Sequence, residues 1–104
     1  YSFSNRFLRD LQNAFLKDLS EKIKQIKLDP EKTDRIVLEY ALPLKKDQKE
    51  KLYSLLLKKK TASLGNKLIE RENKNLLAGF RLEIPGQIIE SNLLDAIKNA
   101  EKNY

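Results

Sequence analysis

The sequence predicts an α+β fold in which a long N-terminal amphipathic helix precedes a small mixed β-sheet of about four strands packed with two helices. Three observations indicate this class. Residues 4–26 place apolar side chains at helical spacing, residues 35–41 are rich in β-branched and aromatic residues, and residues 79–84 alternate apolar with charged side chains. The first pattern is typical of an amphipathic helix, and the other two are typical of strands.

The predicted first helix carries one apolar stripe with a mean spacing of about 3.6 residues, which is one α-helical turn. The stripe consists of Leu8, Leu11, Phe15, Leu19, Ile23 and Ile26, with Phe7 beside it. Asp29-Pro30 is expected to end the helix, because proline cannot donate a hydrogen bond to it.

Two interpretations of this stripe are open: it packs on the chain's own sheet, or it meets a partner helix. A bare stripe would expose more contiguous apolar surface than soluble monomers normally do. We therefore expect at least its N-terminal half to meet a partner. The predicted partner-binding residues are Phe7, Leu8, Leu11, Phe15, Leu19 and Ile23.

The middle of the chain alternates strand and helix signals. Residues 35–41 predict the first strand. Residues 47–60 return to helical spacing, with leucines inward and lysines outward, and residues 67–72 predict a second short strand.

A hairpin follows in residues 79–89. Gly79 opens a strand whose phenylalanine, leucine and isoleucine share one face. Pro85 presets φ for the first corner of a turn and Gly86 tolerates positive φ at the second, so a type II turn is expected there. Ile88 and Ile89 continue as the return strand.

The last predicted element is a helix that begins after Ser91, whose hydroxyl can act as its N-cap. Leu93, Ile97, Ala100 and Tyr104 form one apolar stripe on this helix. Because a hairpin with one apolar face must be covered, we expect the helix to lie across it.

Composition excludes several classes of function. The 104 residues contain no histidine and no cysteine, and the carboxylates form no convincing cluster, so we expect neither an enzyme nor a metal or cofactor site. No apolar run approaches the length of a transmembrane helix. Because the chain begins at Tyr1 and contains no methionine, we expect it to be part of a longer or processed protein.

The net charge of +6 makes a small basic nucleic-acid-binding module the alternative function. The lysines, however, are spread along helices among fifteen acidic residues, and no known nucleic-acid motif accompanies them. We therefore expect a solvated basic surface and no direct contact with nucleic acid.

Residues 36–100 resemble the C-terminal domain of the ATP synthase delta subunit, called OSCP in mitochondria. The matching positions are Ala41, Pro43, Leu44, Gln48, Leu52, Gly79, Phe80, Gly86, Ile89, Ser91 and Leu93. Three positions depart from the family pattern: Ala78 replaces a glycine, Glu90 an aspartate, and Lys45 a serine or threonine. The long helix ahead of the domain is also similar to the stalk b subunits and to the E subunit of vacuolar-type ATPases.

The resemblance implies a non-catalytic stator: a peripheral-stalk component of a proton- or sodium-translocating rotary ATPase. Such a component links the catalytic head to the membrane sector and resists rotor torque. The expected domains are a stalk-like helix at residues 1–28 and a delta/E-like α+β domain at residues 35–104. The expected partners are another stalk subunit, bound through the first helix, and the catalytic head. The implied location is peripheral to the membrane, on its cytoplasmic face or in the matrix or stroma of an organelle.

Overall fold

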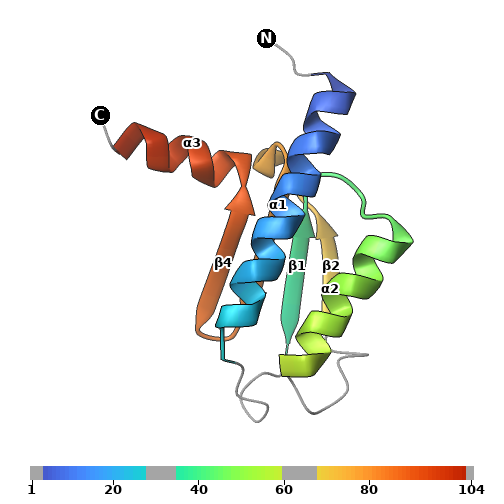
Figure 1. Cartoon of the computed structure of the whole chain (residues 1–104). Helices are drawn as coiled ribbons and strands as arrows, with labels where there is room; N and C mark the ends of the chain where they lie inside the picture. The colour runs from blue at the N-terminus through green and yellow to red at the C-terminus, as the bar shows by residue number, and fades with distance from the viewer. Residues whose placement is uncertain (1–3, 28–34, 60–67, 103–104) are drawn as a thin grey trace.

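Four strands form one mixed sheet that carries two helices on one face (Figure 1). The computed structural model describes residues 4–27, 35–59 and 68–102, without the side chains of 57–59. The elements in chain order are α1 (Asn5–Gln25), β1 (Ile36–Tyr40), α2 (Lys46–Lys59), β2 (Leu68–Glu72), a short 3₁₀ helix η2 (Lys74–Leu76), β3 (Gly79–Ile84), β4 (Gln87–Asn92) and α3 (Leu93–Lys102). The predicted α+β fold class is confirmed.

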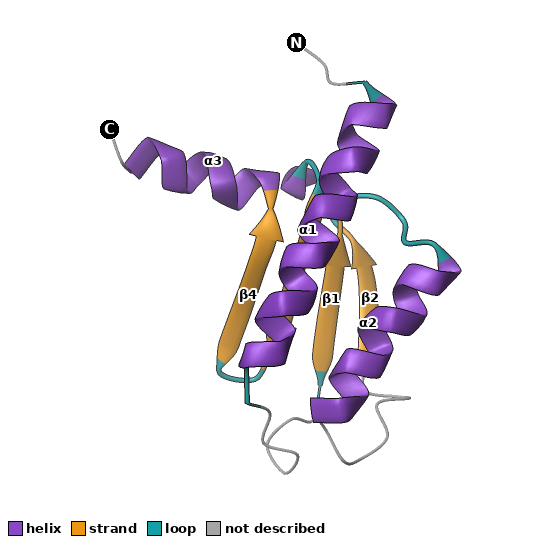
Figure 2. Cartoon of the chain, viewed as in Figure 1, coloured by secondary structure: helices purple, strands orange, loops and turns teal. Residues whose placement is uncertain are grey.

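The strand order is β2-β1-β3-β4. β1 pairs with β2 in parallel, while the β1–β3 and β3–β4 pairs are antiparallel. α2 connects the parallel pair, as parallel strands require a long crossover. Figure 2 shows α1 and α2 together in front of the sheet, with the β3–β4 hairpin behind α1.

The core lies between these two helices and the sheet. Phe80, Leu82 and Ile84 alternate along β3 and turn the same face toward the helices, as their two-residue period predicts. The fully buried residues of this core include Leu19 and Ile23 of α1, Ile36 and Leu38 of β1, Leu52 and Leu56 of α2, and Phe80 and Leu82 of β3. Helix α1 thus belongs to the same core as the sheet.

The ends of α1 follow from its sequence. Ser4 is the N-cap, because its Oγ accepts a hydrogen bond from the Phe7 backbone N–H at 3.1 Å. The helix ends at Gln25, and Ile26 is already extended. The predicted terminator Asp29-Pro30 lies outside the described residues.

The expectation that the last helix covers the hairpin is wrong. α3 projects away from the sheet (Figure 1), contacts only the end of β4 and η2 among its principal neighbours, and buries none of its residues. α1 lies across β3 and β4 instead. The physical reason is the connection: α3 starts directly after β4 at Leu93, so there is no loop in which the chain could turn back over the hairpin.

The structure also differs from the prediction at the start of α3. Ser91 is a buried residue within β4, and the N-cap function belongs to Asn92, whose Oδ1 accepts a hydrogen bond from the Asp95 backbone N–H at 2.8 Å. Ser91 pairs with Phe80 in the hairpin register, so its side chain lies on the face covered by α1. The strand continues further than predicted and moves the cap by one residue.

Candidate partner-binding surface

Helix α1 consists of two halves with different surroundings. In its C-terminal half, Leu19 and Ile23 are 0% exposed and lie in the core described above. In its N-terminal half, which extends past the end of the sheet (Figure 1), Phe7 is 45% exposed and Leu8 and Leu11 are only partly buried. The predicted stripe therefore divides, and Leu19 and Ile23 stabilise the chain's own core.

Phe15 lies where the two halves meet. It is partly buried and packs against the core. Below it, Gly79 begins β3 with a φ of +98°. A Cβ atom at Gly79 would lie 2.3 Å from the Ser91 carbonyl oxygen and 2.9 Å from Cγ of Phe15. Glycine at this position therefore allows α1 to approach the hairpin closely.

Gln12 fixes the direction in which the exposed half leaves the sheet. Its side chain is 5% exposed. Its Oε1 accepts hydrogen bonds from the backbone N–H groups of Leu42 and Gly79, at 3.2 and 3.0 Å, and its Nε2 donates to the Leu42 carbonyl oxygen. One amide thus joins α1 both to the segment after β1 and to the start of β3. We call these three contacts the Gln12 clamp.

Two weaker contacts strengthen this attachment at the start of α2. Asn13 Oδ1 accepts a hydrogen bond from Gln48 Nε2 at 2.9 Å, and Arg9 Nη1 donates to the Pro43 carbonyl oxygen at 3.3 Å. The segment around Pro43 and Gln48, which carries part of the family resemblance, therefore contacts α1. Both contacts are exposed, so each contributes little stability alone.

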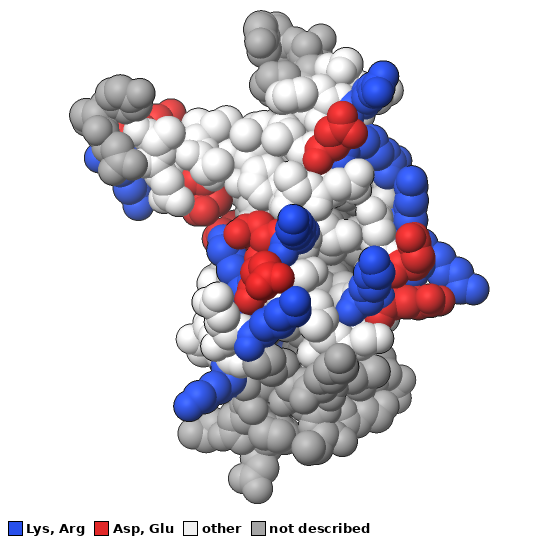
Figure 3. Space-filling view, in the orientation of Figure 1, with Lys and Arg blue, Asp and Glu red and all other residues white. Residues whose placement is uncertain are grey.

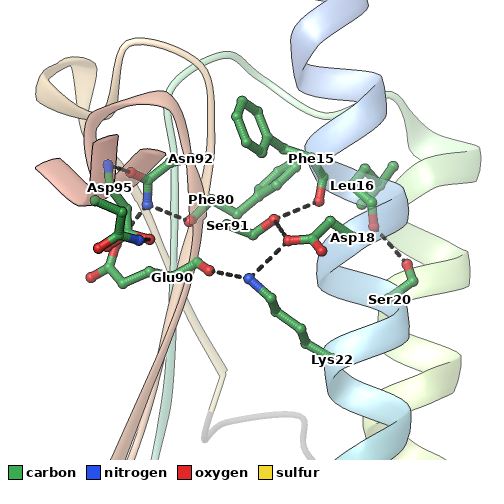
Figure 4. Close-up of polar contacts among 11 residues, drawn as sticks. Phe15, Leu16, Asp18, Ser20, Lys22, Phe80, Glu90, Ser91, Asn92 and Asp95 are labelled. Carbon is green, nitrogen blue, oxygen red and sulfur yellow. Dashed lines mark hydrogen bonds and ion pairs between the residues drawn. The ribbon is translucent and has the colours of Figure 1, made fainter. Parts of the chain in front are cut away.

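A second polar cluster joins the middle of α1 to β4 (Figure 4). Ser91 Oγ lies 2.9 Å from the Phe15 carbonyl oxygen and 2.7 Å from Asp18 Oδ2, so its proton can be donated to either. Lys22 Nζ pairs with Asp18 at 2.9 Å and donates to the Glu90 carbonyl oxygen at 2.8 Å.

This cluster changes the acidity of Asp18. Partial burial alone would raise the pKa of Asp18, but hydrogen bonds from Lys22 and Ser91, together with the positive charge of Lys22, outweigh burial and lower the pKa below its ordinary value. The carboxylate form is therefore the one that holds α1 on β4.

The turn of the hairpin has the geometry that its sequence predicts. Gly86 has a φ of +83°, close to the value of about +80° at the third position of a type II turn. Pro85 precedes it on the exposed tip. A Cβ atom at Gly86 would meet no atom within 4 Å, so only its backbone conformation favours glycine there.

A second apolar surface lies on α3. Ile97 is 40% exposed, and Leu93 and Leu94 are only partly buried. Figure 3 shows that the surface between α3 and the N-terminal half of α1 carries almost no charged atoms on this face. The two helices diverge from the same end of the sheet (Figure 1).

Two contributors to this surface were missed from the sequence. Gln12 lies on the same face of the helix as Leu8, Phe15, Leu19 and Ile23. A polar residue on an otherwise apolar face indicates a buried hydrogen-bonding role, and this pattern could have identified Gln12 from the sequence. The role of Asn92 was less visible, because either it or Ser91 could cap α3.

Neither a metal centre nor a membrane span is found in the described parts of the chain. Within residues 4–27, 35–59 and 68–102, no three histidine, cysteine, aspartate or glutamate side chains converge as metal ligands. None of the helices described is long and apolar enough to cross a membrane.

Comparison with known proteins identifies the family. The family model described as ATP synthase delta (OSCP) subunit matches residues 7–103. A search of curated proteins finds no match. The matched range contains most of α1 as well as the sheet and α3, so the family pattern includes most of the helix that carries the apolar stripe. The chain therefore belongs to the ATP synthase delta (OSCP) subunit family, whose members are peripheral-stalk subunits of ATP synthase.

Proposed function

We propose that this chain is a non-catalytic connector of the peripheral stalk, and that the N-terminal half of α1 binds a helix of another stalk subunit. The observation that carries the proposal is the division of α1: half of its apolar stripe forms core, and the other half continues past the sheet with Leu8 and Leu11 only partly buried. An amphipathic helix with an exposed apolar stripe is the usual docking surface for a second helix.

The contacts at the base of this half support the same function. A stator must transmit torque from its partner into its own fold, which requires a rigid attachment. The Gln12 clamp and the Ser91 cluster hold α1 on two separate segments, β3 and β4. A pull on the exposed half is therefore resisted by hydrogen bonds as well as by the packing of Leu19 and Ile23.

The same role includes contact with the catalytic head and a position peripheral to the membrane. In a rotary ATPase, the subunit would link the head to the membrane sector and keep the head from turning with the rotor. It would lie on the cytoplasmic face, or in the matrix or stroma of an organelle. The coupling ion, a proton or sodium, is a property of the whole complex.

The nucleic-acid alternative has less support. Its basis is the net charge of +6. In Figure 3, lysines and arginines gather along the upper right edge, but they are mixed with acidic residues over the rest of this face. Phosphate binding would also leave the apolar stripe of α1 without a function.

The test is binding of the chain to the soluble helical region of the partner stalk subunit from the same ATP synthase. Leu11→Asp places a charge in the apolar contact and should weaken binding at least about 30-fold, which corresponds to about 2 kcal/mol. Phe7→Asp should act in the same direction. Lys17→Asp is the matched control, because Lys17 is an exposed residue of the same helix.

Calorimetry would give the dissociation constants, and circular dichroism would show whether each variant is folded. Phe15→Asp is unsuitable, because Phe15 contacts the start of β3 and its loss would disturb the fold. Failure of the wild-type chain to bind the partner, or equal binding by folded Leu11→Asp, would overturn the proposal. Salt-sensitive binding of a nucleic acid at micromolar concentration would favour the alternative.

A further inference from the structure

A hollow of about 350 Å³ lies between the start of α1 and the start of α2. Its lining includes Arg6, Arg9 and Asp10 from α1 and Lys45 and Gln48 from the α2 side. The three cations and one carboxylate give the hollow an excess of positive charge. We call it the basic hollow.

The three cations of the basic hollow are not neutralised by acidic side chains of the described part of the chain. Among the described residues, Arg6, Arg9 and Lys45 form no ion pair within 4.0 Å. Some other described cations do have such partners: Lys49 pairs with Glu70 at 3.4 Å. On the sheet face away from the helices, Arg71 and Arg81 both pair with the buried Glu39, and Arg81 also pairs with Glu90 at 3.0 Å.

The donors in the basic hollow are also oriented by the fold. Arg9 is held at one end by the Pro43 carbonyl oxygen, which leaves its other guanidinium N–H groups available. Gln48 bridges Asn13 and the Lys45 backbone N–H, so this wall is fixed. The first turn of α2 adds the positive end of a helix dipole beside the cations.

A second hollow, with two leucines in its lining, adjoins the basic one. It is lined by Asn5, Leu8, Arg9 and Leu42, so Arg9 is common to both. A segment that covers Leu8 with an apolar side chain would therefore place its neighbouring residues beside Arg6, Arg9 and Lys45. The arrangement matches one amphipathic helix with acidic residues at the edge of its apolar face.

We propose that the basic hollow receives a carboxylate from the partner helix, and that it selects a partner whose docking segment is acidic. This inference rests on the proposed function, since the same helix covers the stripe of α1. A guanidinium and a carboxylate form paired charge-assisted hydrogen bonds, which fix the register of two helices as well as adding affinity.

A carboxylate fits the basic hollow better than a phosphate group does. The adjoining Leu8 and Leu42 surface favours a ligand that carries apolar side chains next to its charge. This feature belongs to an amphipathic protein helix and not to a nucleic acid backbone.

The experiment compares two double variants that carry the same net charge. Arg6→Gln/Arg9→Gln removes two cations of the basic hollow, while Lys27→Gln/Lys51→Gln removes two exposed cations elsewhere. Each full-length variant is titrated with the soluble stalk subunit of the same ATP synthase at low and at high salt. A second form of that subunit, with amides replacing the acidic residues of its docking helix, completes a double-mutant cycle.

We expect Arg6→Gln/Arg9→Gln to weaken binding about three- to tenfold at low salt, and to bind the acidic and amide forms of the partner alike. The control variant should keep the wild-type affinity and its preference for the acidic form. Equal affinity of both double variants, or no coupling in the cycle, would overturn the inference while Leu11→Asp still tests the proposed function. No binding by the wild-type chain would overturn both. If a DNA or RNA oligonucleotide competed with the partner for the basic hollow, the ligand would be a phosphate group and the inference would be wrong.

Discussion

The two glycines of the hairpin provide the sharpest test of how α1 sits on the sheet. Both have positive φ, at +98° for Gly79 and +83° for Gly86, so alanine at either position carries a backbone penalty of about 1 kcal/mol. Only Gly79 has close neighbours. Its Cβ would lie 2.3 Å from the Ser91 carbonyl oxygen, where ordinary contact begins at 3.4 Å.

The difference of about 1.1 Å (3.4 minus 2.3) cannot be absorbed by a flexible side chain, because the atom is backbone in the paired strand β4. Relief of the clash requires β4 or α1 to move, at a further cost of about 1–3 kcal/mol. Gly79→Ala should therefore lower the free energy of unfolding by about 2–4 kcal/mol. Gly86→Ala should lower it by about 1 kcal/mol.

Thermal unfolding followed by circular dichroism would measure both variants. At about 4–8 °C per kcal/mol for a domain of this size, Gly86→Ala should reduce the melting temperature by about 4–8 °C and Gly79→Ala by about 10–30 °C. Failure of Gly79→Ala to fold, with Gly86→Ala folded, agrees with the upper end of this range. Equal reductions for the two variants would refute the close packing of β4 and α1 around Gly79.

Two further predictions concern the polar contacts of α1. Gln12→Ala should lower the free energy of unfolding by about 2–3 kcal/mol, because it leaves buried backbone groups without partners. The control Lys17→Ala, at an exposed position, should change it by less than about 0.5 kcal/mol. Urea unfolding would measure both variants. Similar effects would contradict the Gln12 clamp. The lowered pKa of Asp18 stabilises the fold above the unfolded-state pKa of about 3.9, and this contribution is lost as the pH falls through the lower folded-state pKa. Asp18→Asn should therefore be less stable than wild type at pH 7, by under about 1 kcal/mol because the side chain is about half exposed, and the gap should close on acidification.

The helices and the hairpin could be predicted because their signals are local. The stripe of α1 and the alternation along β3 each report which face of an element is apolar, and the Pro85-Gly86 turn fixes how the two strands connect. Local signals do not report what covers an apolar face. Both α1 and α3 carry such a face, and either could have covered the hairpin.

The structure shows why α1 is the one that covers it. α1 is 21 residues long and is separated from β1 by residues 26–35, whereas α3 follows β4 without a loop. The choice also depends on contacts between residues far apart in the chain. Gly79 and Phe15 meet only after folding, so neither residue alone predicts that contact.

The position of Gln12 explains how one helix can serve both as core and as a docking surface. A continuous apolar stripe would let α1 slide along the sheet, because apolar contacts have little directional preference. The three hydrogen bonds of the Gln12 clamp fix the helix at one place, just where the sheet ends and the exposed half begins. In the proposed function, a partner bound to Leu8 and Leu11 would act on a helix whose rotation and register are set by the backbone of Leu42 and of the start of β3. This coupling is what a stalk connection requires, since a docking helix that could rotate on its own domain would transmit no torque.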